Sequence, residues 1–414
     1  MRFALAAAIA ALGLMCVAAK GAPWRARKRP DIPLPNKLAD ARVAIAEWEP
    51  EPKEPKTVDP ERFARALAKL CAFPSSKRAE VIAGSAIAAG KQFDIDPFLL
   101  GALAFTGTYC RARYRDALGV GLTSVPVSMY QDGWRHGRYR YLVEEQGKWV
   151  ERVLDISRFP FIPASLLHTE SNMYFTAGLL SAWRAQHDSV DGWFEQVPHR
   201  SFVSHWIWGD KVKSARDEDR VLTHRRRLLE YYGARPPRAP LQFRGVALGS
   251  ALDGAPRVVS SGLGFVRDDG ERSHRGIDLE AEFGEPVRAI ADGLVIFSGV
   301  DLPGQQAHVQ LKVDETNAYS PSALGHGGRY VCIQHTTSEG PALRSCYMHM
   351  QMVEVTYGDK VTRGQEIGIV GRSGMKSSAP HLHLEMMALD ELLDPLPIMR
   401  GHVIGTPIDF AEVE

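Results

Sequence analysis

The sequence predicts a multidomain protein of the α and β class, in which a helical domain precedes a mostly antiparallel β domain. Its 414 residues are enough for two or three domains, and 45% of them are hydrophobic, so a packed core is expected. Apolar residues recur at helical spacing between about residues 61 and 233. From about residue 260, short β-rich runs are separated by Gly, Asp and Ser.

The first 19 residues are predicted to form a signal peptide. Arg2 supplies a short positive region, Phe3 to Val17 is almost wholly apolar, and small residues follow, with cleavage before Lys20. This apolar run is shorter than the roughly 20 residues of a spanning helix, with a retained anchor as the alternative. We therefore expect an exported protein, periplasmic or extracellular, that has no membrane attachment after signal cleavage.

Residues 20–60 are rich in proline and charge and cannot easily form helix or bury a core, so we expect a disordered tether. The helical domain is predicted over 61–233. On its last helix, the basic run 225–227 is interpreted as a solvated face, with a binding patch as the alternative. The expected helices show helical spacing or a start signal and cover Phe63 to Leu70, Val81 to Ala88, Asp96 to Phe105, Met173 to Arg184 and Asp217 to Tyr232.

Prolines and glycines over 234–259 predict an interdomain linker. The β domain is then predicted over 260–400, and residues 401–414 form a C-terminal tail. Four segments of the β domain are strand-like, namely Val287 to Ile290, Leu294 to Phe297, Tyr330 to Ile333 and Ile367 to Val370.

Charge and cysteine content narrow the functional classes. The net charge of +1 at pH 7 argues against nucleic-acid binding through overall charge. Once the signal is removed, Cys71, Cys110, Cys332 and Cys346 remain, an even number that is compatible with two disulfides in an exported protein. Three pairings are possible, and sequence proximity favours Cys71 with Cys110 and Cys332 with Cys346. Four buried thiols are the alternative.

Two histidine patterns in the β domain suit a metal site. His274 and Asp278 flank a turn that enters a strand, and in that geometry their side chains can converge from the two sides of the bend. His381 and His383 are two residues apart, so in a strand they share one face while the intervening leucines enter the core.

A third pattern lies between these two. The period of a strand puts Tyr347 and His349 on one face, and Cys346, Met348 and Met350 on the other. Together the three segments supply one carboxylate and four imidazoles. Catalytic zinc usually has three protein ligands and an open position, so the surplus histidines would serve as acid–base and charge-stabilising groups.

By these motifs, the segment from about Ser260 to Leu396 resembles the lysostaphin-type (LytM-like) zinc endopeptidases, which cut peptidoglycan peptides. Both the order and the spacing of the motifs fit. The matching segments are His274-Arg275-Gly276-Ile277-Asp278-Leu279, Pro286 to Gly299 with its Ala291-Asp292-Gly293, Tyr347-Met348-His349-Met350, Gly358-Asp359-Lys360-Val361 through Gly364, Gly371-Arg372-Ser373-Gly374 and His381-Leu382-His383-Leu384-Glu385.

The resemblance implies that Zn²⁺ is held by His274, Asp278 and His383, and that His349 and His381 are the two catalytic histidines that are not ligands. It also implies an antiparallel β-sheet groove of the duplicated hybrid motif type. The implied partner is peptidoglycan, whose peptide cross-links or stem peptides would be hydrolysed. The scissile bond stays open between a glycine bridge and a D-alanine to diaminopimelate cross-link.

This sequence departs from the family pattern in one place, a longer segment between Gly299 and Tyr330. It is expected to be either a flap that shapes the cleft or a surface loop. His308, His326 and His335 are interpreted as non-catalytic. A non-enzymatic activator of other wall hydrolases is an alternative function, but such proteins have lost ligands, whereas this sequence keeps the full set.

The region 61–233 resembles, more weakly, lysozyme-like lytic transglycosylase domains. The family's catalytic glutamate would fall at or near Thr106, but Phe105 to Cys110 contains no carboxylate, and glycoside cleavage needs a general acid. We expect an inactive domain that holds glycan or only spaces the peptidase, with a bifunctional enzyme that also cleaves glycan as the alternative. The segments that carry this resemblance are Asp94 to Leu103, Ala117 to Leu122 and Asn172 to Leu180.

Overall fold

The computed structural model describes residues 51–73, 76–136, 139–146, 148–155, 157–189, 202–209, 216–267, 272–304, 308–375, 377–389 and 391–405. The predicted signal peptide and most of the predicted tether lie outside these residues. All of the described residues belong to one compact unit, Lys37–Glu414. Within them, no helix combines the length and the hydrophobicity that crossing a membrane requires.

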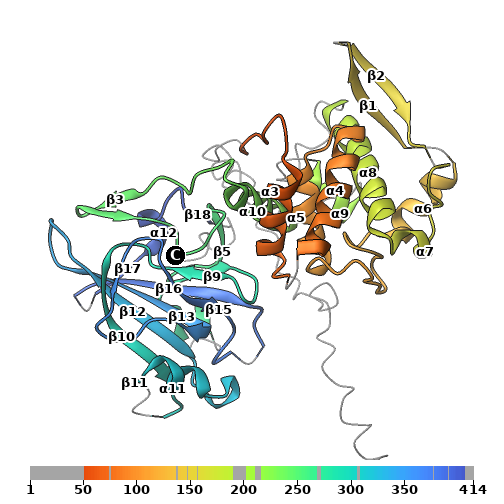
Figure 1. Ribbon diagram of the computed structural model, residues 1–414. Helices are drawn as coiled ribbons and strands as arrows, with labels where there is room; N and C mark the ends of the chain where they lie inside the picture. The colour runs from red at the N-terminus through yellow and green to blue at the C-terminus, as the bar shows by residue number, and fades with distance from the viewer. Residues whose placement is uncertain are drawn as a thin grey trace, which may run out of the picture. The chain divides into compact units, whose positions relative to one another are not determined.

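The first half of the described chain is helical, as predicted (Figure 1). Asp96 begins the central helix, because its side chain accepts a hydrogen bond from the Phe98 amide at 2.8 Å and Pro97 occupies the first turn. The elements are α3 (Pro60–Leu70), α4 (Ser76–Phe93), α5 (Pro97–Thr108), α6 (Val127–Arg135), β1 (Arg140–Glu145), β2 (Lys148–Val153), α7 (Pro163–Leu166), α8 (Thr169–Ser189), α9 (Val203–Trp208) and α10 (Arg216–Tyr232).

The helical core forms around α5, which is apolar on all sides and almost wholly buried. Phe63 of α3 packs on Phe98 of α5, with ring centroids 4.7 Å apart. A disulfide between Cys71 and Cys110 ties the end of α3 to the end of α5. This confirms the first predicted cysteine pair.

The second half is β-rich, and its main sheet has twelve strands. Their main order is β11-β10-β12-β13-β16-β8-β5-β18, and every described pairing in it is antiparallel except that of β18 with β5. The strands are β5 (Arg257–Ser261), β8 (Ile277–Glu280), β9 (Pro286–Arg288), β10 (Gly293–Asp301), β11 (His308–Gln310), β12 (Arg329–His335), β13 (Leu343–Val353), β14 (Lys360–Val361), β15 (Glu366–Val370), β16 (His381–Ala388), β17 (Glu391–Leu393) and β18 (Val403–Gly405). Shorter pieces are β3 (Leu241–Phe243), β4 (Val246–Leu248), β6 (Val266–Arg267), β7 (Arg272–Ser273), α11 (Val313–Ala318), η3 (Pro321–Ala323) and α12 (Pro395–Ile398).

The segment 234–259 does more than connect the two halves. It contains the hairpin β3–β4 and the start of β5, and Leu248 and Leu252 are buried in the β core. Its prolines predicted a linker, but the short apolar run Val246-Ala247-Leu248 after them forms a strand. The region expected as a tail also contributes, since β18 pairs with β5.

The interpretation of residues 225–227 as a solvated face was wrong. Arg225, Arg226 and Arg227 are all buried on α10. Arg226 donates to two backbone carbonyl oxygens of the segment 254–256, both at 3.0 Å, and Arg227 pairs with Glu285 at 3.1 Å. These partners are distant in sequence, so the helical pattern alone could not reveal them.

Candidate metal centre

Three side chains converge at the junction of β8 and β16. Asp278 on β8 lies directly opposite His383 on β16, and His274 precedes β8 by a short turn. The turn passes close to β16, because a Cβ atom on Gly276 would lie 2.3 Å from the Leu384 carbonyl oxygen. This close approach explains why glycine occupies the position.

The donor atoms of the three side chains lie within hydrogen-bonding distance of each other. His274 Nε2 is 2.8 Å from His383 Nδ1 and 3.0 Å from Asp278 Oδ1, and His383 Nδ1 is 2.9 Å from the same Oδ1. All three side chains are buried. Within the described residues, this is the group of His, Cys, Asp and Glu that meets the geometry for holding a metal ion. It unites the three predicted ligands.

The remaining contacts orient the imidazoles of His274 and His383. His274 Nδ1 donates to the Gly262 carbonyl oxygen at 2.6 Å, and since a carbonyl only accepts, the His274 proton lies on Nδ1. His383 Nε2 lies 3.3 Å from Glu385 Oε1, so its proton lies on Nε2. Each ring therefore turns a lone pair toward Asp278. Two imidazole nitrogens and a carboxylate oxygen form a donor set that fits Zn²⁺.

Electrostatics keep Asp278 ionised. Burial raises its pKa, but the adjacent imidazoles of His274 and His383 outweigh burial and hold the pKa well below the usual range. Burial lowers the pKa of His383, yet Asp278 and Glu385 together raise it. The centre thus concentrates negative charge at the point where a cation would bind.

The two further histidines lie beside this group. The ring centroids of His349 and His381 are 5.0 Å apart, and His349 is 5.7 Å from His383. Nδ1 of His349 donates to the Ser373 carbonyl at 3.1 Å, and Nδ1 of His381 to the Ala379 carbonyl at 2.8 Å. Nε2 is therefore the atom at which each ring can exchange a proton.

Burial sets the charge of His349. Together with the neighbouring His381 and His383, burial places the pKa of His349 well below its usual value. His349 is therefore neutral near neutral pH and can accept a proton as well as stabilise charge. His381 Nε2 lies 3.7 Å from Asp278 Oδ1, which ties this ring to the ligand group.

His349 reaches the site through an irregularity of β13 that simple alternation did not predict. Tyr347 faces the core, where its hydroxyl accepts a hydrogen bond from the Ile290 amide at 2.8 Å. A register shift between β12 and β13 and a φ of 63° at His349 then interrupt the alternation. The prediction that Tyr347 and His349 share a face was therefore wrong. Such bulges re-aim side chains next to functional sites.

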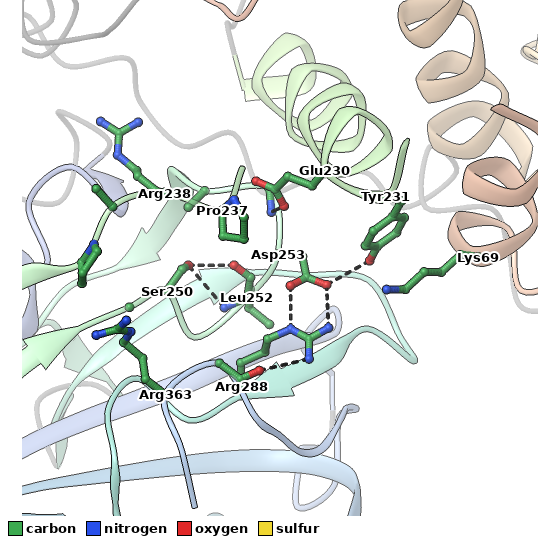
Figure 2. Close-up of a pocket in the computed structure, with 16 residues that line it drawn as sticks. Lys69, Glu230, Tyr231, Pro237, Arg238, Ser250, Leu252, Asp253, Arg288 and Arg363 are labelled. Carbon is green, nitrogen blue, oxygen red and sulfur yellow. Dashed lines mark hydrogen bonds and ion pairs between the residues drawn. The ribbon is translucent and has the colours of Figure 1, made fainter. Parts of the chain in front are cut away.

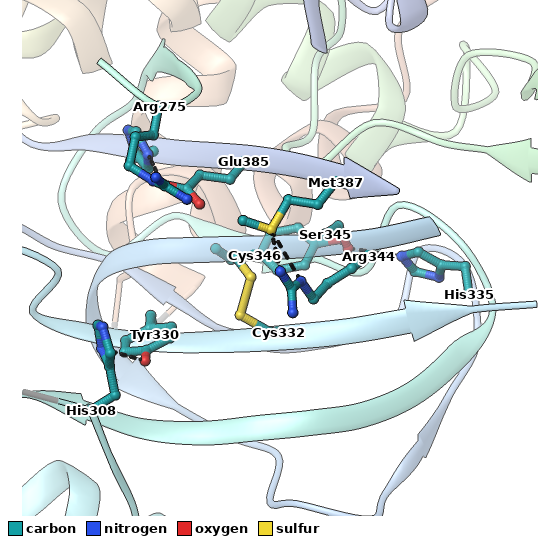
Figure 3. Close-up of a disulfide and its surroundings, with 12 residues drawn as sticks. Arg275, His308, Tyr330, Cys332, His335, Arg344, Ser345, Cys346, Glu385 and Met387 are labelled. Atoms are coloured by element: carbon teal, nitrogen blue, oxygen red, sulfur yellow. Dashed lines mark hydrogen bonds and ion pairs between the residues drawn. A yellow bond between two sulfur atoms is a disulfide. The ribbon is translucent and has the colours of Figure 1, made fainter. Parts of the chain in front are cut away.

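The disulfide between Cys332 and Cys346 confirms the second predicted pair and joins neighbouring strands on the face that carries the histidines (Figure 3). Cys332 lies directly opposite Cys346, and Cys346 directly opposite Glu385. The bridge packs with Tyr330 and Phe297, whose rings stack 4.3 Å apart. It fixes the strand pair from which His349 projects.

The three histidines interpreted from the sequence as non-catalytic lie outside the candidate metal group. His335 is buried and hydrogen-bonded to the Asp292 carbonyl and the Ser345 hydroxyl, both at 2.8 Å, so it stabilises the fold. His308 contacts the Tyr330 hydroxyl at 2.8 Å, and His326 is exposed. The long segment between β10 and β12 holds β11, α11 and η3, and its Gly327 carbonyl accepts a hydrogen bond from the His349 amide at 3.2 Å.

The described residues also line a cavity of about 540 Å³, whose lining residues are drawn in Figure 2. None of the five site histidine and aspartate residues lines it. Two of its charged groups neutralise each other, because Arg288 donates to both oxygens of Asp253, at 2.6 and 3.0 Å. The Tyr231 hydroxyl donates to Asp253 as well, at 3.1 Å. The metal centre therefore remains the candidate functional site.

The region that contains this centre is similar to known proteins. Residues 272–395 match Peptidase family M23. An uncharacterized metalloprotease of Haemophilus influenzae is 32% identical over 31% of this chain and 21% of its own length. Glycyl-glycine endopeptidase ALE-1 of Staphylococcus capitis is 30% identical over 32% of this chain and 31% of its own length. Peptidoglycan DD-endopeptidase ShyA of Vibrio cholerae is 31% identical over 31% of this chain and 23% of its own length. The chain thus spans about a fifth to a third of these relatives.

Proposed function

We propose that this chain, whose C-terminal region contains an M23 peptidase domain, is a zinc-dependent endopeptidase that hydrolyses peptide bonds of peptidoglycan. The observation that carries the proposal is the convergence of His274, Asp278 and His383, with the imidazoles of His349 and His381 beside them. Two relatives are named as endopeptidases, one for glycyl-glycine bonds and one a peptidoglycan DD-endopeptidase. Both names support a peptide bond as the target, and the second supports peptidoglycan as the substrate.

His274, Asp278 and His383 would hold the zinc. A bound zinc would supply the Lewis acidity that amide hydrolysis needs near neutral pH. His349 and His381 contribute their Nε2 atoms, which can take a proton from the attacking water and return it to the leaving amine. Their backbone hydrogen bonds through Nδ1 fix the tautomer and the ring orientation for this work.

Export is part of the proposal. Two disulfides are typical of proteins from an oxidising compartment, and the predicted signal peptide supports the same destination. We therefore place the protein in the periplasm or outside the cell, where peptidoglycan is accessible.

Glycan cleavage by the helical region is disfavoured. Thr106, where a general acid would be expected, donates its hydroxyl to the Ala102 carbonyl at 2.8 Å. Glu282 does reach the end of α5, accepting a hydrogen bond from Tyr109 at 2.7 Å. Burial raises the pKa of Glu282, but Arg220 holds it well below the usual range, so Glu282 cannot protonate a leaving oxygen.

The test is digestion of defined muropeptides by the mature protein, with products identified by mass. We expect peptide products that disappear after chelation and return with Zn²⁺. His383→Ala should lose zinc and activity together, because it removes one of three ligands. Stoichiometric zinc in that variant, or unchanged cleavage after chelation, would contradict the assignment. Sugar products without peptide products would favour glycan cleavage instead.

A further inference from the structure

Glu385 makes a contact with the metal centre that the function above does not use. On β16 it lies two residues after His383 and therefore on the same face. Its Oε1 accepts from His383 Nε2 at 3.3 Å, while His383 Nδ1 faces His274 and Asp278. The imidazole is thus held between the metal position on one side and a carboxylate on the other.

This arrangement sets His383 apart from the other three site histidines. His274, His349 and His381 each direct Nδ1 at a neutral backbone carbonyl. Only the ring of His383, among these four, directs its outer nitrogen at an ionisable carboxylate. A carboxylate acceptor forms a stronger hydrogen bond than a carbonyl and makes the opposite nitrogen a better electron donor.

The environment of Glu385 strengthens the contact. Its side chain is only 6% exposed, and burying a carboxylate is costly unless charged or hydrogen-bonding partners compensate for the lost water. The described partners are the His383 ring and the guanidinium of Arg275, whose Nε lies 3.5 Å from Oε1. Figure 3 shows Arg275 beside Glu385, reaching it from the turn that carries the ligand His274.

We propose that Glu385 is a positioning residue for the metal, which fixes the Nε2 proton and the ring orientation of His383 and thereby sets zinc affinity. Arg275 supports it from the exposed side. The proposal rests on the zinc-dependent function above and goes beyond it, because it assigns control of metal retention to a residue that contributes no ligand atom. Loss of an outer partner of this kind typically weakens metal binding 10- to 100-fold.

The experiment measures zinc affinity by competition with a chromophoric chelator, using the mature protein and the variants Glu385→Gln and Glu385→Ala. We expect one zinc per chain in all three, with affinity falling about 10- to 100-fold in Glu385→Ala. The zinc affinity of Glu385→Gln should lie between those of the wild type and Glu385→Ala, because its amide oxygen still accepts a hydrogen bond from Nε2 but carries no charge. The matched control is Glu366→Gln on β15 of the same sheet, a half-exposed carboxylate paired with Arg288 at 3.8 Å.

The outcomes separate the alternatives. Affinities of both Glu385 variants within twofold of the control would overturn the positioning role. Complete loss of zinc in Glu385→Gln would overturn it too, since Glu385 would then be a ligand. A purely structural role would lower the melting temperature of the metal-free protein and leave affinity unchanged among folded variants. If the wild-type protein itself bound no zinc, that result would contradict the proposed zinc-dependent function, and with it the positioning role that rests on this function.

Discussion

Replacing Glu285 by alanine tests how far buried ion pairs hold the β region to α10. Glu285 lies between β8 and β9 and pairs with Arg227 at 3.1 Å and with Arg257 at 2.9 Å. The three side chains are 2%, 4% and 3% exposed. Burial raises the pKa of Glu285, but the two guanidinium groups keep it below its usual value. Alanine would leave two buried cations without this carboxylate.

The size of the effect follows from burial. Breaking a buried pair by removing one partner costs about 3–5 kcal/mol, because the remaining charge stays desolvated. A folding unit of 150–250 residues loses about 2–4 °C of melting temperature per kcal/mol, and the larger unit Lys37–Glu414 loses less, so the shift should not exceed roughly 20 °C. Glu285→Gln keeps the shape but not the charge, and we expect a smaller loss.

The assay is thermal and urea unfolding of the mature protein, followed by circular dichroism. The matched control is Glu61→Ala, which removes an i,i+4 pair with Arg65 at 3.9 Å whose side chains are 86% and 69% exposed. That control should cost less than about 0.5 kcal/mol. If Glu285→Ala were no more destabilising than Glu61→Ala, the argument from buried charge would be refuted.

Three further predictions follow from individual side chains. Burial lowers the pKa of His224 from 6.5 to about 4, so the folded protein binds fewer protons there than the unfolded chain, and this contribution to stability is lost as pH falls from 6.5 toward 4. As pH falls through this range, the free energy of unfolding of the wild type, measured in urea, should therefore decrease by up to about 1.4 kcal/mol per pH unit more than that of His224→Gln. Parallel curves of the free energy of unfolding against pH would contradict this. His349→Ala and His381→Ala should each keep one zinc but lose about 10²-fold or more in turnover, and near-normal rates in both would remove their catalytic role. Replacing Cys332 and Cys346 together by serine should lower the free energy of unfolding by roughly 3 kcal/mol for so short a loop, measured with and without reductant, and an unchanged midpoint would argue against the bridge.

Local patterns predicted much of the metal centre. The two-residue spacing of His381 and His383 requires a strand with both rings on one face, and β16 has that geometry. Asp278 was identified by its place after a turn, and the register puts it directly opposite His383. The same spacing also places Glu385 on the site face. Its contact with Nε2 could not be read from spacing, because it depends on which way the His383 ring turns.

Other features depend on pairing between distant segments, which local patterns do not encode. The bulge that turns His349 toward the centre arises where β13 slips against β12, at Arg329 to Val331. The arginines of α10 were predicted to face solvent, because a helical pattern does not show which carboxylates of other segments pack against the helix. Weak alternation likewise hid the strands within 234–259.

The strand that carries Asp278, a proposed metal ligand, also leads into charges that bind α10. Glu280, at the end of β8, pairs with Arg216, and Glu282, just beyond it, pairs with Arg220. One end of this segment therefore carries a residue of the candidate metal centre, while charges at the other end are neutralised by cations of the helical region. Since these carboxylates are largely buried, replacing the paired arginine while the helix stays in place would leave each of them without that counter-charge. The helical region thus neutralises charge on the segment that follows Asp278, a contact that requires no carboxylate near Thr106.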